Sequence, residues 1–377
     1  MNLLDWAALA AGGLAILRHA CALPRLFVYL LRARIRSIPR GETPPISLLK
    51  PLFGDEPGLA ENLEATLRQN YPIFEVLFLH ERPDDPALEA AHAAAAKVPD
   101  VPVRFLPGRD PDATNPKAAV LIRGELAAHH AILVASDSDV RPDPLYLRDA
   151  ANALQGGDVA VFPPVLFGMR TVGARLMGLL VNTEGLLSVL LAGGKITPGG
   201  TMAVRVPALR AAGGWRAVSD FMADDLALGR ALRACGHRAA LTRRAVRCRA
   251  PDSTLPAAAR HLTRWMRTVR TTAPLLYFPA LLPASAPLLL LAAGLFGAHP
   301  GLALAALAFH TFARVAVAIA VDFRFCWDRS LLRALPLLPL LWFVEPLAWA
   351  AGALPGSVEW RGRRYRLRGG RATLADR

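Results

Sequence analysis

The sequence predicts an α/β domain with a parallel or mixed sheet, placed between apolar segments of the kind that enter membranes. In residues 42–268, short runs rich in β-branched and aliphatic residues alternate with helical stretches. This alternation is typical of a parallel or mixed sheet. Hydrophobic residues make up 53% of the 377-residue chain, and the apolar excess is concentrated at its two ends. The middle region is therefore interpreted as a folded domain with membrane-associated flanks.

The expected strands and helices follow one another in a regular order within the middle region. The predicted elements are strands at residues 46–49, 74–79, 103–106 and 132–135, and a helix at 59–69 after a turn at Gly54-Asp55. Ligands of such sheets bind outside the carboxyl ends of the strands. The polar residues that follow the second and the fourth predicted strand are therefore candidates for a functional site.

Two acidic motifs follow these strands, Asp84-Asp85 and Asp137-Ser138-Asp139. In an extended segment Ser138 would point away, so that Asp137 and Asp139 project to the same side and share a metal ion. Hard oxygen ligands suit Mg²⁺ or Mn²⁺. Each motif also has a purely structural interpretation, because the first fits a turn with a helix cap and the second fits a solvated loop. Their positions at two strand ends of one sheet favour a site.

A third acidic pair, Asp224-Asp225, opens an apolar-periodic helix at residues 226–232. One carboxylate is expected to cap the N-terminus of this helix, which leaves its neighbour to face a substrate. Separated carboxylates of this kind can hold a divalent cation against a diphosphate leaving group and take a proton from an acceptor hydroxyl. The sequence therefore favours the chemistry of sugar transfer from a diphosphate.

The apolar segments predict an N-terminal anchor at residues 1–36 without a convincing cleavage site, membrane helices at 269–355 and a basic tail at 356–377. Arginines gather where the hydrophobic runs stop, which is typical of cytoplasmic flanks. The catalytic middle is therefore expected to face the cytoplasm from the inner membrane, and two or three C-terminal passes remain open. These arginines are Arg32, Arg34, Arg36 and Arg40 after the first run, and Arg361, Arg363, Arg364, Arg366 and Arg368 after the last.

Composition argues against a nucleic-acid-binding protein and against a chain organised by zinc or disulfides. The net charge is +14, but no basic stripe interleaved with aromatic residues accompanies it, so a nucleic-acid partner is not expected. The four cysteines are far apart and have no paired spacing with histidines, which predicts neither a zinc site nor a disulfide framework.

A series of motifs in order resembles the ceramide glucosyltransferase family of membrane-bound GT-A glycosyltransferases, which includes bacterial hopanoid-biosynthesis members. The resemblance runs almost end to end. It implies a GT-A fold, a UDP-sugar donor, a divalent metal and a membrane lipid acceptor. Its landmarks are Leu49-Lys50-Pro51-Leu52, Gln69-Asn70-Tyr71-Pro72, Asp84-Asp85-Pro86, Asn115-Pro116-Lys117, Asp137-Ser138-Asp139, Asp224-Asp225, Arg264-Trp265, and the tail from Trp360 to Arg368.

The resemblance also implies roles for individual residues. Asp225 matches the general base and Asp224 lies beside it at the acceptor. The first residue of the motif that ends in Arg264-Trp265 should be Gln or Arg, but the chain has His261 there. The implied nucleotide-sugar contacts are Asp85, Asp137, Lys117, His261, Arg264 and Trp265, although Lys117 also fits the start of a solvated helix. Apart from the resemblance, the turn at Gly199-Gly200 suits a weak substrate contact or a simple hairpin. Arg264-Trp265 also fits an ordinary amphipathic helix at a membrane interface.

The expected reaction is an inverting transfer of glucose or N-acetylglucosamine from a UDP-sugar to a hydroxyl of ceramide or a hopanoid polyol. Residues 165–191 fit either an amphipathic lid over the acceptor or a core helix pair. Two alternatives stay open. One is a small processive polysaccharide synthase, and the other is a catalytically silent lipid-binding scaffold, which His261 alone favours.

Overall fold

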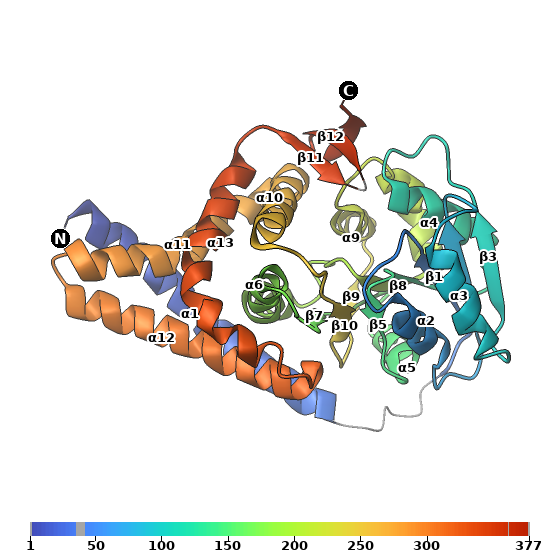
Figure 1. The fold of residues 1–377 in the computed structure, drawn as a ribbon, viewed down its shortest axis with the longest axis horizontal. Helices are drawn as coiled ribbons and strands as arrows, with labels where there is room; N and C mark the ends of the chain where they lie inside the picture. Colours follow the sequence, from blue (N-terminus) through green and yellow to red (C-terminus); the bar gives the residue numbers. More distant parts are fainter. Residues whose placement is uncertain (1, 35–41, 361, 376–377) are drawn as a thin grey trace. The chain divides into compact units, whose positions relative to one another are not determined.

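The computed structural model describes residues 2–34, 42–360 and 362–375, and the chain forms two compact units (Figure 1). The sheet unit comprises residues 29–165 and 192–251, and the helical unit comprises 1–28, 166–191 and 252–377. The division into four segments expected from the sequence, with 42–268 as the middle domain, stays a prediction.

A mixed sheet forms the centre of the sheet unit, as predicted. In the described part of the chain its seven strands have the order β3-β2-β1-β4-β8-β6-β9. The first four run parallel to one another, and β8 is antiparallel to both of its neighbours. The strands are β1 (Ile46–Pro51), β2 (Phe74–His80), β3 (Val103–Pro107), β4 (Ile132–Ser136), β6 (Val159–Val161), β8 (Thr201–Arg205) and β9 (Ala239–Leu241).

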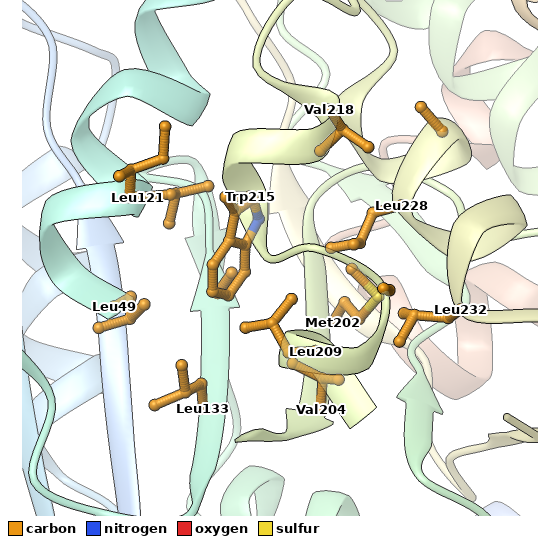
Figure 2. Close-up of a cluster of buried hydrophobic side chains, with 14 of the residues drawn as sticks. Leu49, Leu121, Leu133, Met202, Val204, Leu209, Trp215, Val218, Leu228 and Leu232 are labelled. Atoms are coloured by element: carbon orange, nitrogen blue, oxygen red, sulfur yellow. The ribbon is translucent and has the colours of Figure 1, made fainter. Parts of the chain in front are cut away.

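The helices of the sheet unit are amphipathic segments that follow these strands. They are α2 (Leu59–Leu67), α3 (Ala87–Ala96), α4 (Pro116–Ala127), α5 (Tyr146–Ala153), α8 (Val206–Ala211), the 3₁₀ helix η2 (Trp215–Val218) and α9 (Asp224–Ala234). Figure 2 shows a buried cluster in which Trp215 packs among aliphatic side chains from α4, β4 and α9. Burying apolar area on this scale is the dominant stabilising term in folding. This packing fixes the positions of α4, β4 and α9, the elements that carry or precede the candidate catalytic residues.

A short antiparallel pairing, part of a separate three-stranded sheet, begins immediately after the second acidic motif in the chain. The strand β5 (Val140–Arg141) follows that motif immediately and pairs with β10 (Val246–Arg249). The chain is therefore held by β-structure on both sides of residues 137–139.

The helical unit contains most of the long apolar helices. Its elements are α6 (Val172–Leu180), the π-helix η1 (Val181–Gly185), α7 (Leu186–Ala192), α10 (Leu255–Thr272), α11 (Pro274–Phe296), α12 (Pro300–Val321), η3 (Asp322–Cys326), η4 (Leu332–Leu337) and α13 (Leu338–Ala353), together with most of α1 (Leu3–Arg34). Among the described residues, five stretches are long and apolar enough to cross a membrane: Leu3–Ala33, Val172–Ala192, Pro274–Phe296, Pro300–Cys326 and Leu332–Ala353. The stretch expected to be a lid or core pair is thus one continuous apolar helix with a π-turn.

Four of the charged residues that interrupt these apolar stretches pair with one another inside the helical unit. Arg18 forms an ion pair with Glu184. The Nε atom of Arg314 lies 3.6 Å from Glu184 Oε1, and its Nη1 lies 3.2 Å from Glu345 Oε2. Charges within apolar spans are expensive and are expected to pair. We call these four residues the buried ion network.

The C-terminal segment predicted as a basic tail forms an antiparallel sheet of β11 (Ser357–Trp360), β12 (Arg363–Arg368) and β13 (Arg371–Leu374). Its start is fixed to α10, because Arg267 Nη1 donates to the carbonyl of Ser357 at 2.8 Å. Arg270 Nε donates to the carbonyl of Gly352 at 2.8 Å, one of the carbonyls that a helix end leaves without a partner. Of the predicted flank arginines, Arg36, Arg40 and Arg361 lie outside the described residues.

Candidate active site

Lys117 brings together the carboxylates of two acidic motifs in the sheet unit. Its Nζ lies 2.6 Å from Asp137 Oδ1 and 3.9 Å from Asp224 Oδ2. Burial alone would lower the pKa of Lys117, but the charges of Asp137, Asp224 and Asp225 outweigh it and hold that pKa above its usual value. The lysine therefore stays charged and offsets the repulsion among the three carboxylates.

The Asn115-Pro116-Lys117 motif explains how Lys117 is placed. The Oδ1 atom of Asn115 accepts hydrogen bonds from the backbone amides of Lys117 and Ala118 and so caps the N-terminus of α4. Proline at the first helical position suits the same boundary. The Nδ2 atom of Asn115 also donates to the carbonyl of Phe221 at 2.7 Å, which ties the segment before α9 to the start of α4.

The segment Asp137-Ser138-Asp139 is a turn, and the expectation that it is extended is wrong. The backbone amide of Val140 donates back to the carbonyl of Asp137 at 3.2 Å. Ser138 donates from Oγ to Glu56 Oε2 at 2.6 Å. The alternation of side chains that holds for a strand does not apply to a turn, so the positions of the two aspartates depend on the contacts that hold this turn.

Lys50, which the sequence indicated only as part of a family motif, donates hydrogen bonds to the backbone of this turn. Its side chain has 0% exposure, and its Nζ donates to the carbonyls of Asp137 and Val140 at 2.5 and 3.1 Å. Asn62 Nδ2 donates to the carbonyl of Ser138 at 3.1 Å. A lysine directly after the predicted strand 46–49, next to an apolar run, was the signal for such a role, because a charge is rarely buried without partners.

Asp139 has the electrostatics of a cation ligand. Its Oδ1 is buried and has no hydrogen-bond partner among the described residues. Burial, followed by the charges of Asp137 and Glu56, raises the pKa of Asp139 to about 7. A divalent cation would relieve both effects, so Asp137 and Asp139 fit the predicted metal site.

The protein supplies only part of a coordination shell at this place. In the described ranges, no group of three or more His, Cys, Asp or Glu side chains is arranged to hold a metal ion. Mg²⁺ is commonly bound by one or two carboxylates together with substrate phosphates and water. The donor set formed by Asp137 and Asp139 suits a metal that arrives with a diphosphate.

Asp224 and Asp225 open α9 as predicted, but neither one is the cap residue. The N-cap position is Ala223, so the expectation that one carboxylate caps the helix is wrong. Both lie in the first turn, where the helix dipole favours negative charge. Burial, and next the charge of Asp224, raises the pKa of Asp225 to about 7. Burial also raises the pKa of Asp224. Asp225 therefore has the basicity expected of a proton acceptor near neutral pH.

The predicted glycines lie between Asp225 and the turn that holds Asp137. A Cβ on Gly199 would be 3.1 Å from Asp225 Oδ2, so glycine keeps space beside this carboxylate. Gly200 has φ +100°, a conformation that favours glycine, and its carbonyl accepts from the amide of Asp137 at 2.8 Å. Thr197, which begins the turn that contains both glycines, donates to the carbonyl of Asp225 at 2.7 Å.

Asp85 is buried, and its side chain binds the backbone next to the start of α3, although the N-cap position itself is Pro86. Its Oδ1 accepts hydrogen bonds from the backbone amide of Gly54 at 2.9 Å and from that of Ala87, the first residue of α3, at 3.0 Å. It thereby joins the loop after β1 to the start of α3. Its neighbour Asp84 is exposed and lies 3.5 Å from Arg82. A nucleotide contact for Asp85 stays a prediction.

The remaining candidates, His261, Arg264 and Trp265, lie together on α10 in the helical unit. Arg264 Nη2 is 3.2 Å from His261 Nε2, and the rings of His261 and Trp265 meet edge to face at 4.6 Å. Burial and the charge of Arg264 lower the pKa of His261 to about 3. The neutral ring accepts from Arg264 at Nε2 and keeps Nδ1 as its donor. A diphosphate role for this group stays a prediction.

Comparison with solved structures shows the class of fold. The chain is similar to a mannosyltransferase from Pyrobaculum calidifontis, solved with GDP-mannose and Mn²⁺, with a TM-score of 0.53 at 18% identity. The similarity covers 91% of this chain and 97% of that one. The mixed sheet is thus a GT-A fold, as predicted.

The family follows from the sequence itself. Residues 14–373 match the model of glycosyl transferase family 21, and the chain belongs to that family. It is 25% identical over 232 residues to ceramide glucosyltransferase 1 of Caenorhabditis elegans, covering 57% of this chain and 47% of that one. It is 33% identical over 99 residues to a ceramide glucosyltransferase of Komagataella phaffii, covering 25% and 19%. The matched parts span about half or less of these curated relatives. The predicted family resemblance is confirmed.

Proposed function

We propose that the protein is a membrane lipid glycosyltransferase that transfers glucose or N-acetylglucosamine from a UDP-sugar to a hydroxyl of ceramide or a hopanoid polyol. The observation that carries the proposal is the meeting of Asp137 and Asp224 on Lys117. Motifs that are distant in sequence thereby form one acidic site at the end of β4. The similarity to ceramide glucosyltransferases and the five apolar stretches support a lipid acceptor.

In this proposal Asp137 and Asp139 hold Mg²⁺ or Mn²⁺ against the diphosphate, and the metal supplies charge neutralisation of the leaving group when bound. Lys117 adds a fixed positive charge on the same side. Asp85, His261, Arg264 and Trp265 are assigned to the nucleotide sugar. A guanidinium such as that of Arg264 is suited to a diphosphate because it can pair with two phosphate oxygens at once.

Asp225 is assigned the role of general base. It accepts the proton of the acceptor hydroxyl while the hydroxyl oxygen bonds to the anomeric carbon and the bond from that carbon to the diphosphate oxygen breaks. UDP leaves with the electrons of that bond, and the configuration at the anomeric carbon inverts. Asp224 and the open backbone at Gly199 and Gly200 are assigned to the substrate side. Arginines beyond the apolar runs support a cytoplasmic orientation in the inner membrane.

Replacing Asp225 by Asn tests this assignment. The loss of a general base should lower kcat about 10² to 10⁴-fold, because an amide cannot take up the proton. Detergent-solubilised protein is incubated with UDP-glucose or UDP-N-acetylglucosamine, Mn²⁺ or Mg²⁺, and ceramide or bacteriohopanetetrol, and glycolipid is read by mass spectrometry.

The matched control is Asp112→Asn, which removes a carboxylate that is 82% exposed and should leave turnover unchanged. Product from the wild type and the control, but not from Asp225→Asn, would support the proposal and identify both substrates. Full activity of Asp225→Asn, or turnover that needs no added metal after chelation, would contradict it.

A further inference from the structure

The C-terminal sheet has one face that is covered and one that is open. Val358, Tyr365 and Ala372 are buried, and Val358 lies opposite Tyr365 in the register of β11 and β12. The sheet packs against α10 through β11 and β12. Because side chains alternate between the two faces of a strand, the residues between these buried positions point to the opposite face.

The open face is strongly basic. Arg364, Arg366 and Arg368 alternate along β12 with the buried Tyr365 and the half-buried Leu367, and all three are exposed. Successive members of this row are about 7 Å apart along the strand. The register places Arg371 opposite Arg368 and Glu359 opposite Arg364. Counted over the described residues, four arginines and one glutamate give this face a net charge of +3. We call these four arginines and their face the basic face.

The connection to α13 holds the basic face close to the end of an apolar helix. The candidate membrane stretch ends at Ala353, and β11 begins at Ser357. Four residue steps can span at most about 14 Å. The hydrogen bonds of Arg267 to Ser357 and of Arg270 to Gly352 fix this junction to α10. The sheet is therefore tethered within one short connector of the place where the apolar stretch stops.

We propose that the basic face binds the phosphate head groups of anionic phospholipids at the surface of the bilayer that the apolar helices enter. A guanidinium pairs with two phosphate oxygens at once, and the row of arginines offers several such contacts along one strand. The short tether makes the bilayer surface the nearest source of phosphates. This binding is independent of the proposed reaction, since it requires neither the carboxylates nor Lys117.

The test measures lipid binding to the detergent-solubilised full chain by native mass spectrometry, with phosphatidylglycerol, phosphatidylcholine and UDP as separate probes. The wild type should hold phosphatidylglycerol more tightly than phosphatidylcholine, and added salt should weaken that preference. Each arginine near an anionic surface contributes about fivefold in affinity. Replacing Arg364, Arg366 and Arg368 by Gln should therefore lower the affinity for phosphatidylglycerol about a hundredfold.

Two matched variants keep the test specific. Replacing the exposed arginines Arg68, Arg123 and Arg210 of the sheet unit by Gln removes the same charge and should leave phosphatidylglycerol binding unchanged. Replacing Arg364, Arg366 and Arg368 by Lys keeps the charge and should retain most of the phosphatidylglycerol binding. An unchanged melting temperature of each variant shows that it is folded.

Three outcomes would overturn the proposal. One is equal binding of the two lipids by the wild type, and another is an equal loss of phosphatidylglycerol binding in both glutamine variants, which would mean that only total charge matters. The third is a loss of UDP affinity with phosphatidylglycerol binding intact in the β12 glutamine variant. That result would assign the basic face to the nucleotide instead.

Discussion

At the scale of single residues, the candidate site is a balance of buried charges. Lys117 neutralises part of the charge of Asp137 and Asp224, whereas Asp139 and Asp225 keep pKa values raised to about 7. Because burial is the largest cause of both shifts, they depend on the surrounding fold and not on the motifs alone.

The raised pKa of Asp225 predicts the pH dependence of catalysis. A general base acts in its deprotonated form, so kcat/KM should fall as the pH drops through about 7, by about tenfold per pH unit below it. An unperturbed aspartate, with a pKa of about 3.9, would give a flat profile over the same range.

The profile is measured between about pH 5 and 8 at saturating metal. Replacing Asp224 by Asn removes the neighbouring charge that raises the pKa of Asp225 and should move the acidic limb to lower pH. A profile that is flat down to pH 5 in the wild type would contradict the assignment.

Lys50→Met is predicted to destabilise the fold and to weaken metal binding. The substitution leaves two buried carbonyls without their donor, which costs about 1–3 kcal/mol for each unsatisfied group. It also removes the charge beneath Asp139. Unfolding in detergent and Mn²⁺ affinity by electron paramagnetic resonance measure the two effects. Lys97→Met, at an exposed position, is the control and should change stability by less than about 0.5 kcal/mol. Equal stability of the two variants would contradict the role of Lys50.

At the scale of elements, the boundary of α4 links two parts of the site. Asn115 caps α4 and also binds the carbonyl of Phe221 shortly before α9. One side chain thus sets the position of Lys117 and of the segment that leads to Asp224. The π-helix η1 is a second special element, since π-turns are frequent at functional sites and η1 contains Glu184 of the buried ion network.

Asn115→Ala is predicted to lose both the N-cap of α4 and the hydrogen bond to the carbonyl of Phe221. Asn115→Ser should lose only the bond to Phe221. Serine is nearly as good an N-cap as asparagine, whereas alanine costs about 1 kcal/mol as a cap. We expect the wild type to be the most stable, Asn115→Ser to be intermediate and Asn115→Ala to be the least stable. Turnover should fall in both variants, because the segment before α9 loses its hydrogen bond to residue 115. Thermal melting and turnover measure this. Wild-type turnover in Asn115→Ser would show that the bond to Phe221 does not position the site.

At the scale of the whole molecule, the helical unit depends on a neutral set of buried charges. Arg18 and Arg314 balance Glu184 and Glu345. Removing one member leaves an uncompensated charge among apolar helices, and breaking a buried pair costs about 3–5 kcal/mol. Replacing a pair together by groups without charge is often close to neutral.

The pair Arg314 and Glu345 tests this balance. Arg314→Met and Glu345→Gln should each lower the melting temperature strongly, whereas the double variant should lie closer to the wild type than either single variant. Melting in detergent checks the prediction. If the decrease in melting temperature of the double variant equals the sum of the two single decreases, the four charges do not act as a network.

The sequence by itself determined the features that depend on local pattern. The strands predicted at 46–49, 74–79, 103–106 and 132–135 are present, each one or two residues longer. The C-terminal apolar stretches and the start of α9 likewise follow from periodicity and chain length. The family was predictable from motifs in order. Alternation between the faces of a strand and the length of an apolar run are properties of neighbouring residues, and they can therefore be predicted without knowledge of tertiary contacts.

Only the tertiary structure decided which of these residues meet. It placed Lys117 between Asp137 and Asp224, buried Lys50 beneath a turn that the sequence predicted to be extended, and folded the basic tail into a sheet. It also paired the four charged residues of the buried ion network. These contacts join residues far apart in the chain, and burial determines their strength. Neither the partner of a charged side chain nor the water excluded around it is encoded in local periodicity.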